Sequence, residues 1–178
     1  MKKIILIFAA IIMIAGFSSK VMAQATENTA AAATIIAPIT ITETAALNFG
    51  TLAVLAATPG TCVLSTTGTR TPNGGVNLSA QAPTSSNAAY NVGGANNTTY
   101  AISFGAPSIT VDDGGAPLHT MVVDNFLART ASAGANGLTG TLNGSGADAF
   151  TVGATLNVNN GQTPGTYTGT FDVTVAYN

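Results

Sequence analysis

Few side chains in this sequence could carry out acid–base or nucleophilic chemistry. His119 is the only histidine of the 178 residues, and Cys62 is the only cysteine. A nucleophile–base pair would have to join His119 to a serine that is distant in the sequence, and no nucleophile-elbow motif surrounds any serine. We therefore expect His119 to be a surface or strand-edge residue. We also expect the protein not to be an enzyme, with no catalytic residue and no cofactor.

The acidic residues offer a weak pattern for metal binding. Asp112 and Asp113 precede two glycines, and further aspartates follow at Asp124 and Asp148. Carboxylates are calcium ligands, but this stretch lacks the Asp/Asn spacing and the distal Glu of a calcium-binding loop. One Cys and one His are also too few for a zinc site. We interpret residues 112–115 as an acidic hairpin turn and expect no metal site.

Charge is scarce, and the cations are unevenly placed. Only 7% of the residues are charged, with five Lys and Arg against seven Asp and Glu. Lys2, Lys3 and Lys20 lie at the start of the chain, so the rest of the sequence carries only Arg70 and Arg129 as cations. Binding to phosphates depends on many Lys and Arg side chains. We therefore expect no nucleic-acid partner, and the lack of lysine after residue 20 excludes Schiff-base and P-loop chemistry there.

The first 23 residues have the three parts of a secretory signal peptide. A cationic start is followed by an uncharged run from Ile4 to Phe17 and then by small residues. The apolar run is shorter than the roughly 20 residues that a spanning helix needs. We predict cleavage after Ala23, with cleavage after Ala25 as the alternative. The mature protein is then expected to be secreted or located at the cell surface, without a transmembrane anchor.

The single cysteine cannot form an intramolecular disulfide in an exported chain. Cys62 lies within an apolar strand pattern at residues 61–64, and we expect it to be a small buried hydrophobic residue. An intermolecular disulfide or a reactive thiol is the alternative.

The composition after the signal peptide favours strands over helices. Glu, Lys, Gln and Arg, which cover the exposed faces of helices, are rare, whereas Thr, Asn and Gly are abundant. Residues 150–158 and 100–104 alternate between apolar and polar side chains, as a strand with one buried face does. Further strand candidates are residues 35–42, 47–54, 61–66, 75–79, 88–92, 120–126 and 138–143. Many short strands separated by turns predict an all-β fold, an antiparallel two-sheet Ig-like sandwich.

The predicted organisation has three parts. Residues 1–23 form the signal peptide, residues 24–33 an extended N-terminal arm, and residues 34–178 a single β-sandwich domain. The loop at residues 128–137 contains mainly small and polar residues, and we expect it to be flexible.

The end of the chain has the strongest strand pattern. Odd-numbered positions from 165 to 177 carry a nearly unbroken series of apolar residues and glycines, while most positions between them are polar. This pattern predicts one long strand with a single apolar face. The residues that we expect to lie on this apolar face are Gly165, Tyr167, Phe171, Val173, Val175 and Tyr177.

The terminal segment resembles the last strand of chaperone–usher pilus subunits. Gly165 lies fourteen positions from the end and Tyr177 is the penultimate residue, as in those subunits. Segments 34–41, 47–52, 68–71, 90–94, 121–123 and 150–156 extend the likeness. Taken in order, they are similar to an uncharacterised family of secreted bacterial β-sandwich domains related to spore coat protein U and archaic chaperone–usher pilin subunits.

The resemblance implies a non-catalytic exported subunit of a pilus, coat or matrix, which assembles through β-strand edges. In such pilins the terminal strand pairs with a periplasmic chaperone by β-augmentation. Self-assembly and a periplasmic chaperone are therefore the implied partners, and the six residues on the apolar face of the terminal strand are the implied assembly residues of an edge strand.

Two features keep other interpretations open. No cysteine lies between Gln24 and Gly60, where the related pilins carry a pair, and the arm before Thr34 is mostly Ala and Thr, with bulky Ile35 and Ile36 only at its end. A self-complete sandwich that does not polymerise is one alternative. Another is a secreted adhesin-like module that binds carbohydrate or another surface ligand through loop tips and an exposed tyrosine.

Overall fold

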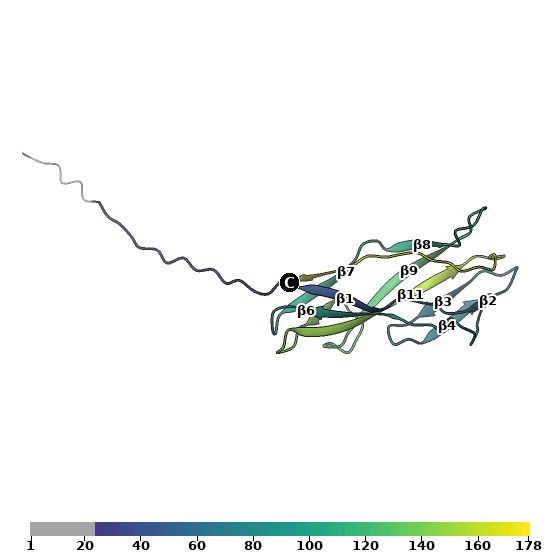
Figure 1. Cartoon of the computed structure of the whole chain (residues 1–178), viewed down its shortest axis with the longest axis horizontal. Helices are drawn as coiled ribbons and strands as arrows, with labels where there is room; N and C mark the ends of the chain where they lie inside the picture. The colour runs from purple at the N-terminus through teal and green to yellow at the C-terminus, as the bar shows by residue number, and fades with distance from the viewer. Residues whose placement is uncertain (1–23) are drawn as a thin grey trace, which may run out of the picture. The chain divides into compact units, whose positions relative to one another are not determined.

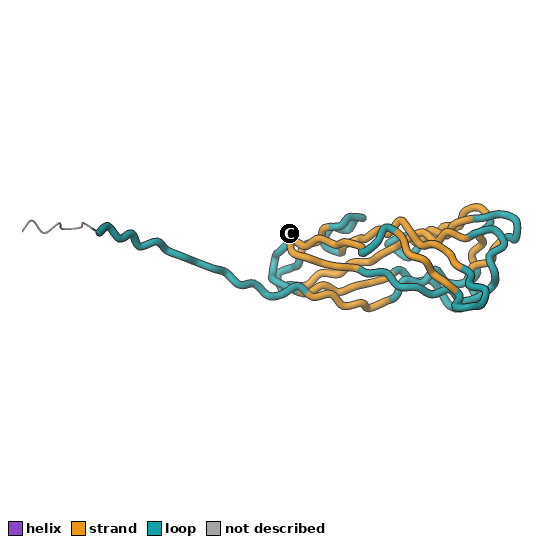
Figure 2. Tube along the Cα trace, turned by 90° about the horizontal axis from the view of Figure 1, so that it is seen from above, coloured by secondary structure: helices purple, strands orange, loops and turns teal. Residues whose placement is uncertain are grey.

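A computed structural model describes residues 24–178, and these residues form strands and loops without a helix (Figure 1). The predicted signal peptide, residues 1–23, lies outside the described residues. Ile36–Asn178 form one compact unit, within which the strands run roughly along a common direction (Figure 2). Residues 24–35 form neither helix nor strand, and all of them are exposed.

The strands follow one another without an intervening helix. In chain order they are β1 (Thr40–Ala45), β2 (Leu52–Val54), β3 (Gly60–Leu64), β4 (Arg70–Gly74), β5 (Val76–Leu78), β6 (Ala88–Gly93), β7 (Thr99–Phe104), β8 (Ser108–Asp112), β9 (Thr120–Thr130), β10 (Thr139–Thr141), β11 (Ala147–Val158) and β12 (Val173–Tyr177).

The larger sheet has seven strands and is built around β11. One edge of β11 pairs first with β6 and then, further along, with β3, while its other edge pairs with β9. Outside these lie β1 on β6, β4 on β3 and β8 on β9, and every pairing is antiparallel. A three-stranded sheet in the order β10-β7-β12 is the second layer, and β2 and β5 form a small separate ladder.

The core lies between the two layers. One cluster joins Tyr90, Phe150 and Val152 of the larger sheet to Tyr100 and Ile102 of the smaller one. The rings of Tyr90 and Phe150 stack with their centroids 4.9 Å apart. A second cluster lies beneath the other half of β11; its buried members are Cys62, Val76, Met121, Val123, Ala154, Leu156 and Val158. The predicted all-β antiparallel sandwich is confirmed.

The start of the first strand differs from the prediction. β1 begins at Thr40 rather than at residue 35, and Ile35 is 96% exposed. Pro38 lies just before β1 and has no backbone N–H with which to extend the ladder. In the candidate segment 47–54 only β2 is a strand, because Gly50 adopts a φ of +71° that breaks the extended backbone.

Two strands were not predicted. β4 contains the Pro-Asn-Gly sequence that resembles a turn, yet it pairs with β3 along its whole length, with Pro72 opposite Cys62. Proline is tolerated there because β4 is an edge strand. β8 has only Ile109 and Val111 as large apolar residues, which is too short an alternation to stand out.

The expected flexible loop at residues 128–137 begins later than predicted. β9 continues to Thr130, and Ala128 and Thr130 are 2% and 0% exposed. Residues 131–137 are all exposed and form the loop itself.

The predicted long terminal strand is also shorter than expected. Only Val173–Tyr177 form β12, although the main chain of Thr168 exchanges two hydrogen bonds with Asp112 at the end of β8. Further along, the carbonyl of Asp172 accepts a hydrogen bond from Gly105, next to β7. The segment therefore leaves the larger sheet and joins the smaller one, and this crossing interrupts the strand.

Candidate functional site

β12 lies at an edge of the three-stranded sheet. It pairs with β7, from Val173 opposite Phe104 to Tyr177 opposite Tyr100, and within the described part of the chain its other edge has no strand partner. Val175 is 8% exposed and its alternate neighbours are partly buried, whereas the side chains between them are exposed. The apolar residues of β12 thus face the core on one side of an open strand edge.

β1 forms an edge of the larger sheet and lies close to β12 (Figure 1). It pairs only with β6, and no ladder joins it to β12 among residues 24–178. We call the boundary between these two edges the seam. The apolar side chains along the seam are partly buried and pack against the first core cluster. They are Ile39, Ile41, Phe171, Val173 and Tyr177.

The Tyr177 side chain spans one end of the seam. Its hydroxyl donates a hydrogen bond to the carbonyl of Ala37, just before β1, over 2.8 Å. It accepts another from the backbone N–H of Ala95 over 2.6 Å. Gly94 must lack a side chain, because a Cβ atom there would overlap the Tyr177 hydroxyl. The penultimate residue therefore ties the end of β12 to the chain entering β1.

The structure separates the six predicted edge residues into two groups. Phe171, Val173, Val175 and Tyr177 are at or beneath the seam, and the Phe171 ring stacks on Phe126 with centroids 4.9 Å apart. Gly165 and Tyr167 belong to the part of the segment that lies beside β8 rather than β7; Tyr167 packs against the second core cluster.

The hydroxyl of Tyr167 is fully engaged by its own loop. It donates a hydrogen bond to the carbonyl of Thr163 over 2.7 Å and accepts one from the side-chain amide of Gln162 over 2.8 Å. The sequence pattern did not reveal this division, because alternation continues across the point where the segment changes sheets.

The two arm residues singled out from the sequence are exposed. Ile35 is 96% exposed and Ile36 is 51% exposed. Ile35 is the most exposed large apolar side chain of residues 24–178, whereas Leu55 and Leu118 are as exposed as Ile36. Both isoleucines are thus accessible to another surface.

His119 is paired with Asp113 across the β8–β9 turn. Its Nδ1 atom lies 2.7 Å from Oδ2 of Asp113, and Oδ1 of Asp113 accepts hydrogen bonds from the backbone N–H groups of His119 and Gly115. These donors hold the pKa of Asp113 at about 2, below its usual range. Among residues 24–178 no serine hydroxyl is bonded to His119, so the pair stabilises a turn without forming a nucleophile–base arrangement.

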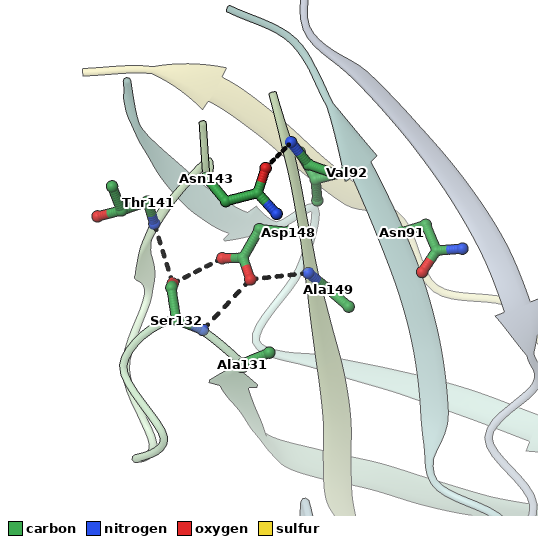
Figure 3. Close-up of a pocket in the computed structure, with 9 residues that line it drawn as sticks. Asn91, Val92, Ala131, Ser132, Thr141, Asn143, Asp148 and Ala149 are labelled. Atoms are coloured by element: carbon green, nitrogen blue, oxygen red, sulfur yellow. Dashed lines mark hydrogen bonds between the residues drawn. The ribbon is translucent and has the colours of Figure 1, made fainter. Parts of the chain in front are cut away.

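The partly buried carboxylate of Asp148 connects the two layers, and Figure 3 shows its hydrogen bonds to Ser132 and Ala149. Oδ2 of Asp148, on β11, accepts hydrogen bonds from the hydroxyls of Ser132 and Tyr100, over 2.6 and 3.0 Å. Oδ1 accepts from the backbone N–H groups of Ala149 and Ser132. Burial, assisted by Asp148, raises the pKa of Tyr100, which is fully buried in β7. The four donors occupy both carboxylate oxygens, so Asp148 is poorly placed to act as a base.

The side chains of Arg70 and Cys62 are both engaged within the fold, the first by hydrogen bonds and the second by burial. The guanidinium of Arg70 donates hydrogen bonds to the carbonyls of Phe49, Thr51 and Ser79 over 3.0, 3.2 and 3.0 Å. It thereby ties the loops around β2 and β5 to β4. Cys62 is 0% exposed, and burial raises the pKa of its thiol, which agrees with the predicted buried hydrophobic role.

Residues 24–178 contain neither a helix that could span a membrane nor a cluster of metal ligands. No helix in residues 24–178 is long and apolar enough to cross a membrane. No three His, Cys, Asp or Glu side chains of that same range are grouped closely enough to hold a metal ion.

Comparison with known proteins gives a family assignment. No curated protein matches the chain. The family model described as Domain of unknown function (DUF4402) matches residues 39–177, which is well over half of the 178 residues and includes every strand of the sandwich. The chain therefore belongs to the DUF4402 family.

Proposed function

We propose that the protein is a non-catalytic exported structural subunit, of the kind that builds a pilus, coat or matrix, and that it assembles through unpaired β-strand edges. The observation that carries this proposal is the seam, where the free edges of β1 and β12 lie close together over partly buried apolar side chains. The resemblance of the terminal segment to the last strand of chaperone–usher pilus subunits supports the same function, as does the likeness of the earlier segments to spore coat protein U and archaic pilin subunits.

The hydrogen-bonding groups of β12 are arranged for strand addition. Asn178 donates to Thr99 of β7, and Asp172 accepts from Gly105, so the main chain of the even-numbered residues faces β7. The N–H and C=O groups of Val173, Val175 and Tyr177 consequently face the seam. An added strand would pair with these groups and cover the apolar side chains below, as in β-augmentation.

The arm of a second copy is the strand that this chain can offer. Within residues 24–36 its bulky apolar side chains are Ile35 and Ile36, and most of the others are Ala and Thr. Burial stabilises by about 25 cal/mol per Å² of apolar surface, so the two isoleucines would contribute most of the apolar term. A periplasmic chaperone strand is the other proposed partner, and it would occupy the same edge before assembly.

Polymerisation of the mature protein tests this proposal. We expect purified protein starting at Gln24 to form polymers that survive mild denaturant, and deletion of residues 24–36 to leave only monomers. Ile35→Ser combined with Ile36→Ser should have the same effect, whereas Ala31→Ser combined with Ala32→Ser should not. Size-exclusion chromatography with light scattering measures the outcome. A mature protein that stays monomeric at high concentration would show that the sandwich is self-complete.

A secreted binding module is the second candidate function. Its expected exposed tyrosine is missing among residues 24–178: Tyr90 and Tyr100 are buried, and Tyr167 and Tyr177 are partly buried with engaged hydroxyls. A shallow groove on the larger sheet, lined by small and polar side chains together with Arg129, favours this candidate in a different form that needs no tyrosine.

A further inference from the structure

Two adjoining depressions form one groove that runs over the outer face of the larger sheet and reaches β10 of the smaller sheet at one end. The first, of about 620 Å³, is the one drawn in Figure 3. The second has a volume of about 320 Å³. Both are lined by Asn91, Ala131 and Ala149, so the two are continuous. We call this combined surface the outer groove.

The outer groove is hollow because its floor consists of small side chains. Ala89 on β6 and Ala149 on β11 point away from the core, since their neighbours Tyr90 and Phe150 are core residues. Arg129 on β9 stands opposite Thr151, which stands opposite Ala89. Asn91, which stands opposite Ala149, and Arg129 therefore flank this floor from strands on either side of β11. They are separated by roughly 10 Å across the sheet and by two residues along the strands.

Arg129 supplies the only uncommitted cation of residues 24–178. The other one, Arg70, already donates hydrogen bonds to three carbonyls. Within the same part of the chain Arg129 forms no ion pair, and its partly exposed side chain lines the second depression. A guanidinium pairs most strongly with a carboxylate or another planar anion, through two parallel hydrogen bonds.

The remaining lining exposes more apolar than polar surface, most of it from small side chains, and its polar groups belong to Asn, Ser, Thr and Asp residues. Asp148 is the acidic residue of the groove, and four internal donors occupy its oxygens. Asn91 is exposed and presents an amide that both donates and accepts, and Thr141 adds an exposed hydroxyl (Figure 3). No large apolar side chain is exposed in the lining to anchor a peptide. A ligand that carries many hydroxyls and a carboxylate matches this surface.

We propose that the outer groove binds an acidic saccharide. A uronic acid unit would place its carboxylate on Arg129 and its ring hydroxyls on Asn91 and, further along the groove, on Thr141. This site goes beyond the proposed assembly role, because it lies on the outer face of the larger sheet and uses neither the seam nor the arm.

Titration of the full mature protein with defined oligosaccharides tests the proposal. The probes are a galacturonic acid trisaccharide and, as the uncharged match, a galactose trisaccharide, followed by NMR chemical shifts at low ionic strength. We expect the acidic probe to bind more tightly and to shift the amide signals of Asn91, Arg129 and Ala149. Added salt should weaken the binding, because it screens the charge on Arg129.

Three variants separate the site from the rest of the sheet. Arg129→Gln should weaken binding of the acidic trisaccharide on the order of tenfold or more, since it removes a charge-assisted pair. Asn91→Ala should weaken it by a smaller factor. Thr155→Ala, on the same face of β11 but outside the groove, should leave it unchanged. If Arg129→Gln does not fold, Arg129→Lys keeps the charge without the two-pronged geometry and should give an intermediate loss.

Four results would overturn the proposal. They are equal binding of the neutral trisaccharide, absence of binding at millimolar concentration, unchanged binding by the folded Arg129 variant, and equally tight binding of a glutamate tripeptide. The last would show that the groove recognises a carboxylate regardless of the sugar. None of these results bears on polymerisation, so the two proposals fail independently.

Discussion

At the scale of single residues, several polar side chains form hydrogen bonds between segments that are not paired as strands. The Tyr177 hydroxyl joins Ala37 to Ala95, Arg70 joins three carbonyls, and Asp148 joins the two layers through Tyr100. Each interaction depends on one side chain that reaches main-chain or buried groups. Because these groups would be left without partners, the loss of such a side chain is costly.

The Tyr177 hydroxyl provides the first prediction. Tyr177→Phe keeps the ring but removes both hydrogen bonds, which leaves the Ala95 N–H and the Ala37 carbonyl to find water. We expect the free energy of unfolding to fall by about 1–2 kcal/mol. Urea denaturation measures this change, with Thr174→Ala on the exposed side of β12 as the control. Equal stability of the two variants would show that the hydroxyl does not fasten the start of β1.

Asp113 gives a prediction about pH. Its pKa is lowered from 3.8 to about 2, mainly by the backbone N–H groups of His119 and Gly115 and by the imidazole. A carboxylate whose pKa is lowered by folding stabilises the fold at pH values above its pKa in the unfolded state. This stabilisation is lost as the pH falls through its pKa in the folded state. We therefore expect stability to decline as the pH falls from about 4 to about 2, and Asp113→Asn to flatten that part of the profile. Thermal unfolding across this pH range measures the effect, and a variant profile parallel to that of the wild type would contradict it.

At the scale of elements, the protein has one strand that organises the others. β11 pairs with β6, β3 and β9, so it lies inside the larger sheet, while β1 and β12 are left at edges. Its near-continuous burial is consistent with this position. The functional proposal depends on the contrast between a central strand with every partner in place and two edges with one partner each.

The seam can be tested by placing a charge on either face of β12. Val173 is partly buried beneath the seam, whereas the adjacent Thr174 is exposed. We expect Val173→Lys to prevent polymerisation, because an inward-pointing charge blocks strand addition, and Thr174→Lys to permit it. Light scattering of both variants measures the outcome, and circular dichroism checks that each is folded. Polymers of folded Val173→Lys would exclude β12 as the assembly edge.

At the scale of the whole molecule, the low charge has a consequence for proteolysis. Trypsin cleaves after Lys and Arg, and after residue 20 the sequence has only Arg70 and Arg129. Arg70 lies in β4, paired with β3, and Arg129 lies in β9, paired with β11. A surface structure built from such subunits would expose very few cleavable sites.

Trypsin treatment of the mature protein measures this protection. We expect the folded protein to remain intact under conditions that cleave it after both arginines in denaturant, because strand residues must leave their ladder to enter a protease. Elastase is the control, since the exposed Ala-rich residues 24–35 should be removed first. Rapid native cleavage after Arg129 would show that β9 opens easily.

The sequence determined the class of the fold and its inward face. Alternation at residues 150–158 indicated which side chains of β11 are buried, and the rarity of helix-forming residues excluded a helical domain. It also identified the apolar face of β12 and the buried position of Cys62. These inferences succeed because side-chain periodicity and burial are local properties of a strand.

Only the tertiary structure decided which edges remain open and which side chains meet. Strand pairing is non-local, so the sequence did not reveal that β1 and β12 end at neighbouring edges or that the terminal segment changes sheets after Thr168. It also did not reveal that Arg129 and Asn91 flank one groove, because their distance depends on the register of three strands. Hydrogen bonds between distant strands set that register, and no pattern within one segment encodes it.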